Sequence, residues 1–343
     1  MTINFAIIGF GKMGQIRANI LSSFENVNIS KIYNLSPVNS KYSQVDDYSE
    51  IIEDKSIDAV VICMPNKFNF EITVKSLRNN KHVFCEKPPA FTSSEVQEII
   101  QAERKSNKKL MYGFNHRHHD SIIKIKELIN KGDFGKILWM RGRYGKSVDA
   151  SFYDDWRSKR ELSGGGILLD QGIHMLDLFI YLGGDFDKVH AFVSNLYWNL
   201  DSIEDNVFAI MKNSKSGIVA SLHSTMTQWR HLFSLEIFLE KGYLVLNGLK
   251  TSSGTYGNEE LVIARNRSKA PAATWSDEER HIYNTDNSWL HEMEHFLESI
   301  TKDTKIKVGS SSDAHSIMLH LEKIYNSELD KSDNLYTDLN SHG

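Results

Sequence analysis

Short apolar runs alternate with longer amphipathic segments over about the first 115 residues of the chain. The runs predict strands at 3–8, 28–34, 58–63, 82–85 and 109–113. Between them the pattern predicts helices over 12–24, 68–79 and 92–105, and a short helical piece near 47–54. Apolar strands that alternate with helices indicate a parallel sheet covered on both faces, and right-handed crossovers make it doubly wound.

The pattern changes after about residue 120. A helix over 120–131 and a strand over 137–145 precede a polar, glycine-rich stretch, and another helix begins near residue 170. Strands without intervening helices follow at 188–198, 205–213, 216–227, 231–239 and 242–247, and helices return at 288–301 and 311–327. We therefore expect an α/β protein with a Rossmann domain over 1–120. An α+β domain with a large open, mostly antiparallel sheet is expected over 121–343. The polar residues 328–343 are expected to be loose.

Composition narrows the class of protein. The 343 residues are 41% hydrophobic and 24% charged, with a net charge of −4 and no block of like charges. These values are typical of a soluble globular protein and do not indicate a nucleic-acid or membrane partner. The chain enters a strand at once, so we expect no signal peptide and a cytoplasmic location. Cys63 and Cys85 lie in predicted buried strands and are expected to be reduced thiols.

Glycines follow the first predicted strand in the spacing G-x-G-x-x-G, from Gly9 through Gly11 to Gly14. This spacing between a strand and a helix is typical of a turn that binds a dinucleotide. Gly9 permits the tight turn, Gly11 lets the backbone approach a pyrophosphate, and Gly14 lets helix and strand pack closely. The following helix begins with Lys12 and Met13. Its N-terminus offers free backbone N–H groups and the positive end of the helix dipole to a phosphate. An ordinary glycine-rich turn is the alternative.

Two further motifs carry titratable side chains. Glu86-Lys87-Pro88 follows the strand at 82–85, where a doubly wound sheet binds its ligands, so Lys87 could serve as an acid or base. Asp170 and His174 are spaced i and i+4 on a predicted helix and share one face. The alternatives are a solvated loop lysine, a helix-capping aspartate and a histidine with only structural hydrogen bonds.

Together these motifs resemble the Gfo/Idh/MocA family of NAD(P)-dependent oxidoreductases over nearly the whole chain. The resemblance implies a cis peptide bond at Lys87–Pro88 and a cofactor, NAD, held by the glycine turn. It adds further cofactor-binding residues, namely Met64, Pro65, Asn66, Glu86, Lys87, Asn115 and Arg157. It also implies substrate contacts from Lys87, Arg117, Tyr144, Trp156, Arg157, Asp170 and His174.

The family's chemistry is hydride transfer between a secondary hydroxyl carbon and nicotinamide. His174 is the first choice of general base, because an imidazole titrates near neutral pH. Asp170 would orient His174 or relay its proton, and Lys87 would stabilise the developing alkoxide. Lys87 as the base is the rival assignment, and both remain open.

The ribose end of the cofactor site departs from the common pattern. Asn34 occupies the position where NAD-binding folds carry Asp or Glu, and Ser36 follows it. The absence of a carboxylate removes repulsion against NADP, while no arginine follows to attract its phosphate. NAD is therefore favoured, and NADP remains possible.

The substrate is expected to be a small carbohydrate. Arg143, Lys146 and Arg157 suit an anionic group, so a nucleotide sugar or sugar acid is the first expectation. Residues 227–231 could also contribute. Alternatives are an inositol or polyol dehydrogenase, an NAD-dependent redox-cycling glycosidase and a non-catalytic nucleotide sensor.

Two expectations concern partners. His291 and His295 have a spacing that can bind zinc, yet no third ligand is evident, and we expect no metal. A homodimer or homotetramer is expected through the large sheet of the C-terminal domain, because that sheet has a face to cover.

Overall fold

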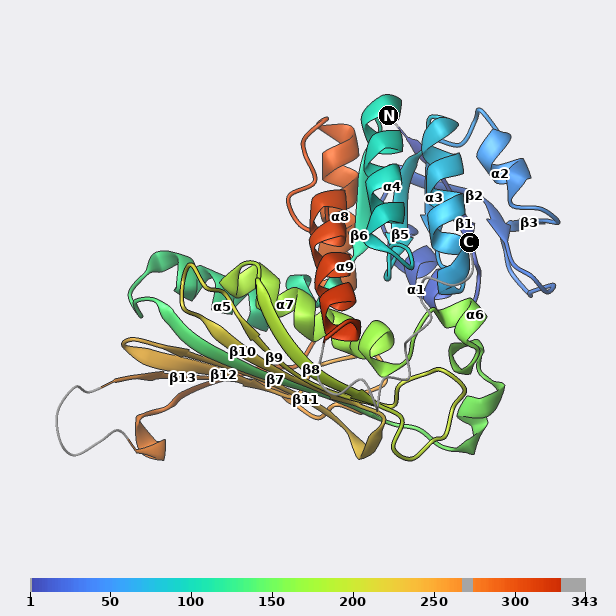
Figure 1. Ribbon diagram of the computed structural model, residues 1–343. Helices are drawn as coiled ribbons and strands as arrows, with labels where there is room; N and C mark the ends of the chain where they lie inside the picture. The colour runs from blue at the N-terminus through green and yellow to red at the C-terminus, as the bar shows by residue number, and fades with distance from the viewer. Residues whose placement is uncertain (1, 267–273, 328–343) are drawn as a thin grey trace. The chain divides into compact units, whose positions relative to one another are not determined.

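The computed structural model describes residues 2–266 and 274–327, which form two compact units (Figure 1). The first unit contains the residues up to Asn115 together with Ser288–Leu319. Within the described ranges, the second contains residues 116–287 and 320–327. The expected division into domains 1–120 and 121–343 stays a prediction. The compact first unit includes, in addition to its N-terminal residues, helical segments from the C-terminal part of the chain.

The first unit is built on a six-stranded sheet with the order β3-β2-β1-β4-β5-β6. Its strands are β1 (Ile3–Ile8), β2 (Val27–Tyr33), β3 (Ser43–Val45), β4 (Ala59–Ile62), β5 (His82–Glu86) and β6 (Leu110–Gly113), and all paired strands are parallel. Its helices are α1 (Lys12–Leu21), α2 (Ser49–Glu53), α3 (Asn69–Arg78), α4 (Ser93–Ser106) and α8 (Ser288–Thr301), with part of α9 (Ser311–Tyr325). The predicted doubly wound sheet is confirmed. The short edge strand β3 was missed.

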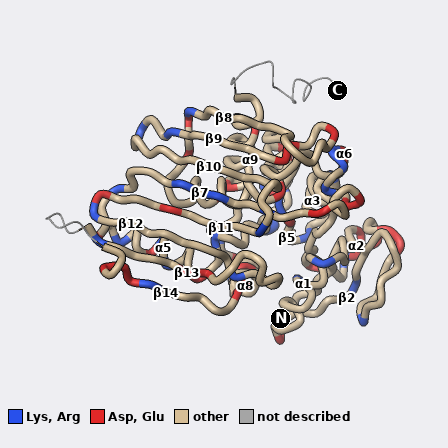
Figure 2. Tube along the Cα trace, turned by 90° about the horizontal axis from the view of Figure 1, so that it is seen from below, with Lys and Arg blue, Asp and Glu red and all other residues tan. Residues whose placement is uncertain are grey.

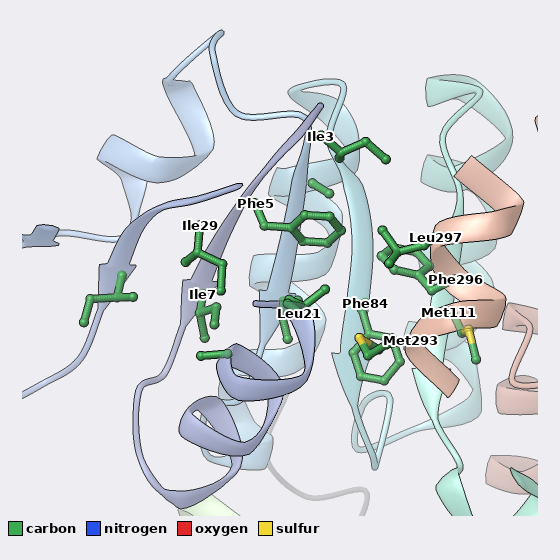
Figure 3. Packing of buried hydrophobic residues seen from close by; sticks show 14 of the residues in the cluster. Ile3, Phe5, Ile7, Leu21, Ile29, Phe84, Met111, Met293, Phe296 and Leu297 are labelled. Atoms are coloured by element: carbon green, nitrogen blue, oxygen red, sulfur yellow. The ribbon is translucent and has the colours of Figure 1, made fainter. Parts of the chain in front are cut away.

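The core of the first unit joins segments from both ends of the chain (Figure 3). Phe296 of α8 packs edge-on against Phe5 of β1 at 6.3 Å and against Phe84 of β5 at 5.8 Å between ring centroids. All three side chains are fully buried. Burying a large aromatic side chain contributes about 1.5–3 kcal/mol, so this contact explains why the C-terminal helix belongs to the first unit.

The second unit contains an eight-stranded sheet with the order β14-β13-β12-β11-β7-β10-β9-β8. Its strands are β7 (Ile137–Ser147), β8 (Lys188–Ser194), β9 (Asn206–Lys212), β10 (Val219–Thr225), β11 (Thr227–Leu239), β12 (Gly242–Asn247), β13 (Glu259–Arg265) and β14 (Glu279–Tyr283). Only the pairing of β7 with β10 is parallel among these described strands. The expected large, mostly antiparallel sheet is confirmed.

Helices α5 (Asp120–Lys131) and α7 (Ile173–Gly183) lie on one face of this sheet (Figure 1). Strand β7 shows the resulting alternation, because Met140 and Tyr144 are buried while Trp139 and Arg141 are exposed. Figure 2 shows lysine, arginine, aspartate and glutamate interspersed along the strands. No helix within the described ranges is both long and apolar enough to span a bilayer.

Several predicted boundaries in the second unit were wrong. The strand expected over 188–198 ends at Ser194, because the Asp205 carboxylate accepts the backbone N–H groups of the following turn and bends the chain. The helix expected near residue 170 begins with a π-helical turn, η5 (Leu168–Gly172), which continues into α7. Strands β13 and β14 were missed, and the expectation for residues 328–343 lies outside the described residues.

Candidate functional site

The glycine turn of the first unit has the geometry that close backbone approach requires. Gly9 has φ +97°, and a Cβ built on it would lie 2.5 Å from the Cys63 carbonyl oxygen. A Cβ on Gly14 would lie 2.1 Å from the Gly9 carbonyl oxygen. A Cβ on Gly11 would meet no atom of the described chain within 4 Å. Two glycines therefore close the turn, while the middle one leaves open space beside the backbone.

Helix α1 begins directly after this open position. Gly11 is its N-cap, and no side chain in the described part of the chain caps the first turn, which contains Lys12 and Met13. A helix start without a side-chain cap presents N–H groups and the positive end of the helix dipole to an anion. The open space at Gly11 and the uncapped helix start thus fit the pyrophosphate of a dinucleotide.

Asn34 and Ser36 lie beyond β2, beside the glycine turn. Asn34 Oδ1 accepts the backbone N–H of Phe10 at 3.1 Å, and Asn34 Nδ2 donates to the Ser36 carbonyl at 3.0 Å. The Asn34 side chain therefore ties the end of β2 to the turn, and its contact with the cofactor ribose stays a prediction.

The residues after β4 border the same turn. The Cβ position of Gly9 lies 2.9 Å from the Met64 backbone nitrogen, and Met64 itself is buried. Pro65 is half-buried and precedes the short 3-10 helix η1 (Asn66–Phe68). Met64, Pro65 and Asn66 thus follow a strand adjacent to β1, at the carboxyl edge where parallel sheets bind ligands.

The Glu86-Lys87-Pro88 segment is held by buried polar contacts. The Lys87–Pro88 peptide bond is cis, as the family resemblance implies. The side chain of Asn69 donates to the carbonyl oxygens of Glu86 at 3.2 Å and Pro88 at 2.8 Å. Because Asn69 is fully buried, these bonds fix the backbone on both sides of Lys87.

A buried arginine holds the Glu86 carboxylate. Arg17 of α1 donates to Glu86 Oε1 from Nε at 2.9 Å and from Nη2 at 2.7 Å, and its Nη1 lies 2.6 Å from Glu292 Oε2 on α8. Burial opposes the charge on Arg17, yet the Glu292 and Glu86 carboxylates raise its pKa above the ordinary value. Glu86, expected at the cofactor, is thus also the carboxylate partner of Arg17.

Asn115 lies at the end of the N-terminal segment of the first unit and contacts its C-terminal segment. Its side chain donates to the hydroxyl of Ser288 at 3.2 Å, and both residues are buried. This bond joins the end of β6 to the start of α8. Its proposed contact with the cofactor stays a prediction.

In the second unit a buried carboxylate caps the helical segment that carries Asp170 and His174. Glu204 is fully buried, and it accepts the backbone N–H groups of Gly166 at 2.7 Å and Leu168 at 2.9 Å. Tyr325 donates its hydroxyl to the same carboxylate at 3.0 Å. A negative charge at a helix start is stabilising, so Glu204 fixes where η5 and α7 begin.

His174 lies among aromatic rings. Its imidazole stacks on that of His116, with centroids 4.0 Å apart and an interplanar angle of 18°. His116 Nε2 lies 3.1 Å from the Tyr144 hydroxyl, and the Tyr144 ring meets that of Tyr256 edge-on at 5.3 Å. Burial and the neighbouring Tyr256 raise the pKa of Tyr144 well above its ordinary value, so Tyr144 stays a neutral phenol.

Asp170 is paired with two cations. Lys146 Nζ donates to Asp170 Oδ2 at 2.9 Å, and Arg157 Nε lies 3.5 Å from Asp170 Oδ1. Arg157 also pairs with Asp155 at 3.3 Å and stacks on the half-buried Trp156, 4.4 Å from its ring centroid. The structure therefore brings Asp170, Trp156 and Arg157 together with Lys146.

Arg117 has a buried partner. It makes two bonds to Asp177 of α7, at 2.8 and 2.6 Å, and both side chains are almost fully buried. The pair fixes the short helix η2 (Asn115–His118) to α7. Its expected substrate contact stays a prediction, and the geometry supports a positioning role through η2, which also carries His116.

The histidines with zinc-like spacing have other contacts. His295 Nε2 accepts the backbone N–H of Lys307 at 3.0 Å, and burial lowers its pKa. In the described part of the chain no group of three or more His, Cys, Asp or Glu side chains could hold a metal ion.

Arg17, Asn69 and Glu204 are among the residues that escaped sequence reasoning. Each acts through partners far away in the chain, so no local spacing indicates them. The structure shows why residue 166 is a glycine, since a Cβ there would lie 2.0 Å from the Glu204 carbonyl oxygen.

An open glycine turn on a doubly wound sheet defines a dinucleotide-binding protein. The chain matches two family models. Residues 3–114 match the model described as oxidoreductase family, NAD-binding Rossmann fold, and residues 122–245 match the GFO/IDH/MocA C-terminal domain. The chain therefore belongs to the Gfo/Idh/MocA oxidoreductase family.

Similar proteins include two sugar dehydrogenases. Levoglucosan dehydrogenase of Pseudarthrobacter phenanthrenivorans is 34% identical over 154 residues, which cover 44% of this chain and 40% of that protein. D-glucoside 3-dehydrogenase of Escherichia coli is 28% identical over 63% of this chain and 68% of that protein. A solved levoglucosan dehydrogenase in complex with NADH and levoglucosan matches with a TM-score of 0.84 and 22% identity, covering 95% of this chain and 97% of that one. This likeness shows the shared fold.

Proposed function

We propose that the protein is an NAD-dependent dehydrogenase that oxidises a secondary hydroxyl of an uncharged sugar ring. The observation that carries this proposal is the charge balance around Asp170. Lys146 and Arg157 contact Asp170, and Arg157 also contacts Asp155. Two cations thus face two carboxylates, and the group as a whole has no excess charge to attract an anionic substrate.

This proposal departs from the expected nucleotide sugar or sugar acid. Lone cations beside a pocket favour a phosphate or carboxylate, but cations that already bind carboxylates would have to exchange one anion for another. Hydroxyl groups, in contrast, can bond to a paired carboxylate and ammonium without separating them. The two similar dehydrogenases described above carry names of uncharged sugars, which supports the same substrate class.

The proposed chemistry divides among three side chains. Nicotinamide, when bound at the glycine turn, supplies the acceptor of the hydride. His174 is proposed to take the hydroxyl proton as general base. Its ring stacks on that of His116 at 4.0 Å, which disfavours protonation of both rings at once. Asp170 would hold the Lys146 ammonium and the hydroxyls beside the reacting one. Lys87 is proposed to donate a hydrogen bond to the oxygen as charge develops, with the role of base as the alternative.

Substitution of Asp170 tests the charge argument. Asp170→Asn leaves Lys146 and Arg157 with one carboxylate, so we expect weaker turnover of a methyl glucoside. Glucuronate should bind about tenfold more tightly, which corresponds to ~1.4 kcal/mol. Nicotinamide absorbance would follow turnover of methyl glucosides, levoglucosan and myo-inositol against glucuronate and a nucleotide sugar.

The matched control is Asp154→Asn, which removes the same charge from an exposed neighbour. Its substrate preference should equal that of the wild type. A wild-type protein that oxidises glucuronate or a nucleotide sugar and ignores every uncharged sugar would overturn the proposal. Preference for myo-inositol would identify a polyol dehydrogenase, whose substrate is also uncharged.

A further inference from the structure

A group of aromatic side chains lies at the surface of the second unit. Tyr153, Tyr197 and Trp229 are 44%, 60% and 67% exposed. The rings of Tyr197 and Trp229 meet edge-on at 5.2 Å, and Trp198 contacts Tyr197 at 5.2 Å and Tyr153 at 6.1 Å. We refer to these four residues as the aromatic cluster. Contiguous exposed aromatic surface is costly in water and commonly marks a binding site.

Hydrogen bonds hold Trp198, Tyr153 and the backbone of Tyr197 in place without a ligand. The buried Asp205 carboxylate accepts the backbone N–H groups of Tyr197 at 2.7 Å and Trp198 at 3.0 Å. The indole N–H of Trp198 donates to the Met226 carbonyl at 2.9 Å, and the Tyr153 hydroxyl donates to the Trp198 carbonyl at 2.8 Å. The Trp198 and Tyr153 rings are fixed in this way, and such rings lose little entropy when a ligand binds to them.

Packing connects the aromatic cluster to the candidate site. Trp198 belongs to a buried group that includes Phe152 and Ile167. The Lys146 ammonium, which binds Asp170, lies 5.1 Å from the Phe152 ring centroid. Tyr153 follows Phe152 in the chain and precedes Trp156 by one short turn. The aromatic cluster therefore borders the charged group of the candidate site through shared neighbours.

A hollow of about 310 Å³ adjoins the aromatic cluster, with Tyr153 as one wall. Apart from the apolar Leu200, its remaining lining is polar or charged: Ser158, Lys159, Arg160, Glu161, Asn199 and Asp201. The volume is at the lower end of the range for ligand pockets, about 300–1,000 Å³, and suits one ring. An aromatic wall with polar groups around it matches a sugar ring, which has apolar C–H faces and a rim of hydroxyls.

We propose that the aromatic cluster and this hollow hold a second ring of the substrate, next to the ring that is oxidised. The substrate would then be a glycoside of two or more rings rather than a free monosaccharide or cyclic polyol. This inference rests on the proposed function, since it names the substrate class of the same site. The concave, hydroxyl-matching rim favours such a ring over the flat surface of another protein chain.

Variants of the exposed rings test the inference. Trp229→Ala and Tyr197→Ala would be compared with Trp275→Ala, which removes a tryptophan that is 82% exposed elsewhere in the unit. Substrates would be phenyl glucosides, maltose and cellobiose against the matching methyl glucosides. We expect the wild type to prefer the two-ring compounds about tenfold in kcat/KM. The two cluster variants should raise KM for those compounds about tenfold with KM for methyl glucosides unchanged, while Trp275→Ala resembles the wild type.

Three results would overturn the inference: equal use of one-ring and two-ring compounds by the wild type, equal losses on both in the cluster variants, or a lower sedimentation mass of Trp229→Ala. The last result would assign the rings to contact between copies of the chain. If no sugar is oxidised, the proposed function fails, and phenyl glucoside binding still tests the second-ring site through protein fluorescence with NAD present. Saturable quenching that Trp229→Ala abolishes would support this site, and its absence would refute it.

Discussion

Replacement of Arg17 by methionine should destabilise the first unit strongly. Arg17 is fully buried between the rings of Phe84 and Trp289, with its guanidinium 4.3 and 4.6 Å from their centroids. It binds the carboxylates of Glu86 and Glu292, which are also buried. Methionine has a similar length and fills much of the same space, so the change removes the charge and its hydrogen bonds while largely preserving packing.

The magnitude follows from what remains after the substitution. Two buried carboxylates would lose their shared cation, and breaking a buried ion pair from one side costs about 3–5 kcal/mol. We therefore expect the free energy of unfolding of the first unit to fall by about 4 kcal/mol near neutral pH. The loss should shrink on acidification, because carboxylates without a counter-charge become neutral by taking up protons. Adding Glu292→Gln should restore part of the loss.

Urea unfolding, followed by far-UV circular dichroism and by retention of NAD binding, would measure these effects. Arg78→Met provides the matched control, because Arg78 is exposed on α3 of the same unit. Its effect should stay within about 0.5 kcal/mol. A loss below about 1 kcal/mol for Arg17→Met, or one that does not depend on pH, would refute the view that Arg17 neutralises two buried carboxylates.

Three further outcomes are expected. Asn34→Asp should raise the preference for NAD over NADP about tenfold in kcat/KM, since a carboxylate repels the 2′-phosphate; an unchanged ratio would place the ribose elsewhere. Glu204→Gln should cost about 2 kcal/mol in urea unfolding and lower kcat through misplacement of His174, whereas unchanged stability would contradict its capping role. Burial, aided by Lys108 and Lys109, lowers the pKa of His82 from 6.5 to about 4. Because the unfolded chain then binds the proton first, stability should fall by up to about 3 kcal/mol as the pH drops from 6.5 to 4, and His82→Gln should flatten this dependence.

The sequence predicted the first unit well, because buried parallel strands are continuous apolar runs between helices. It predicted the second unit less completely. The apolar run of β13 covers only residues 261–264, after Glu259 and Glu260. Two of the five residues of β14, Glu279 and Arg280, are charged, so β14 shows no apolar run. The two C-terminal helices were predicted, but not that α8 packs on β1, since that contact depends on tertiary packing.

Part of the candidate site could likewise be predicted from the sequence, and part could not. Glycine spacing, the Glu-Lys-Pro segment and the Asp170/His174 pair are local patterns and were visible in the sequence. The stacking of His116 on His174 and the pairing of Lys146 with Asp170 join distant segments of the chain. The sequence suggested cations available for an anionic substrate, and only the structure showed that carboxylates already pair with two of them, Lys146 and Arg157.

The most direct test of the proposed oxidation is NAD reduction by purified wild-type protein with an uncharged glycoside, compared with Lys87→Ala and His174→Ala. The variants must first be shown to bind NAD as tightly as the wild type. We predict that the wild type reduces NAD and that both variants lose at least a hundredfold in kcat, the usual loss when an acid–base or oxyanion contact is removed. Near-normal turnover in both variants would contradict the assignment of the site. Absence of wild-type turnover with every uncharged sugar would contradict the proposed function itself.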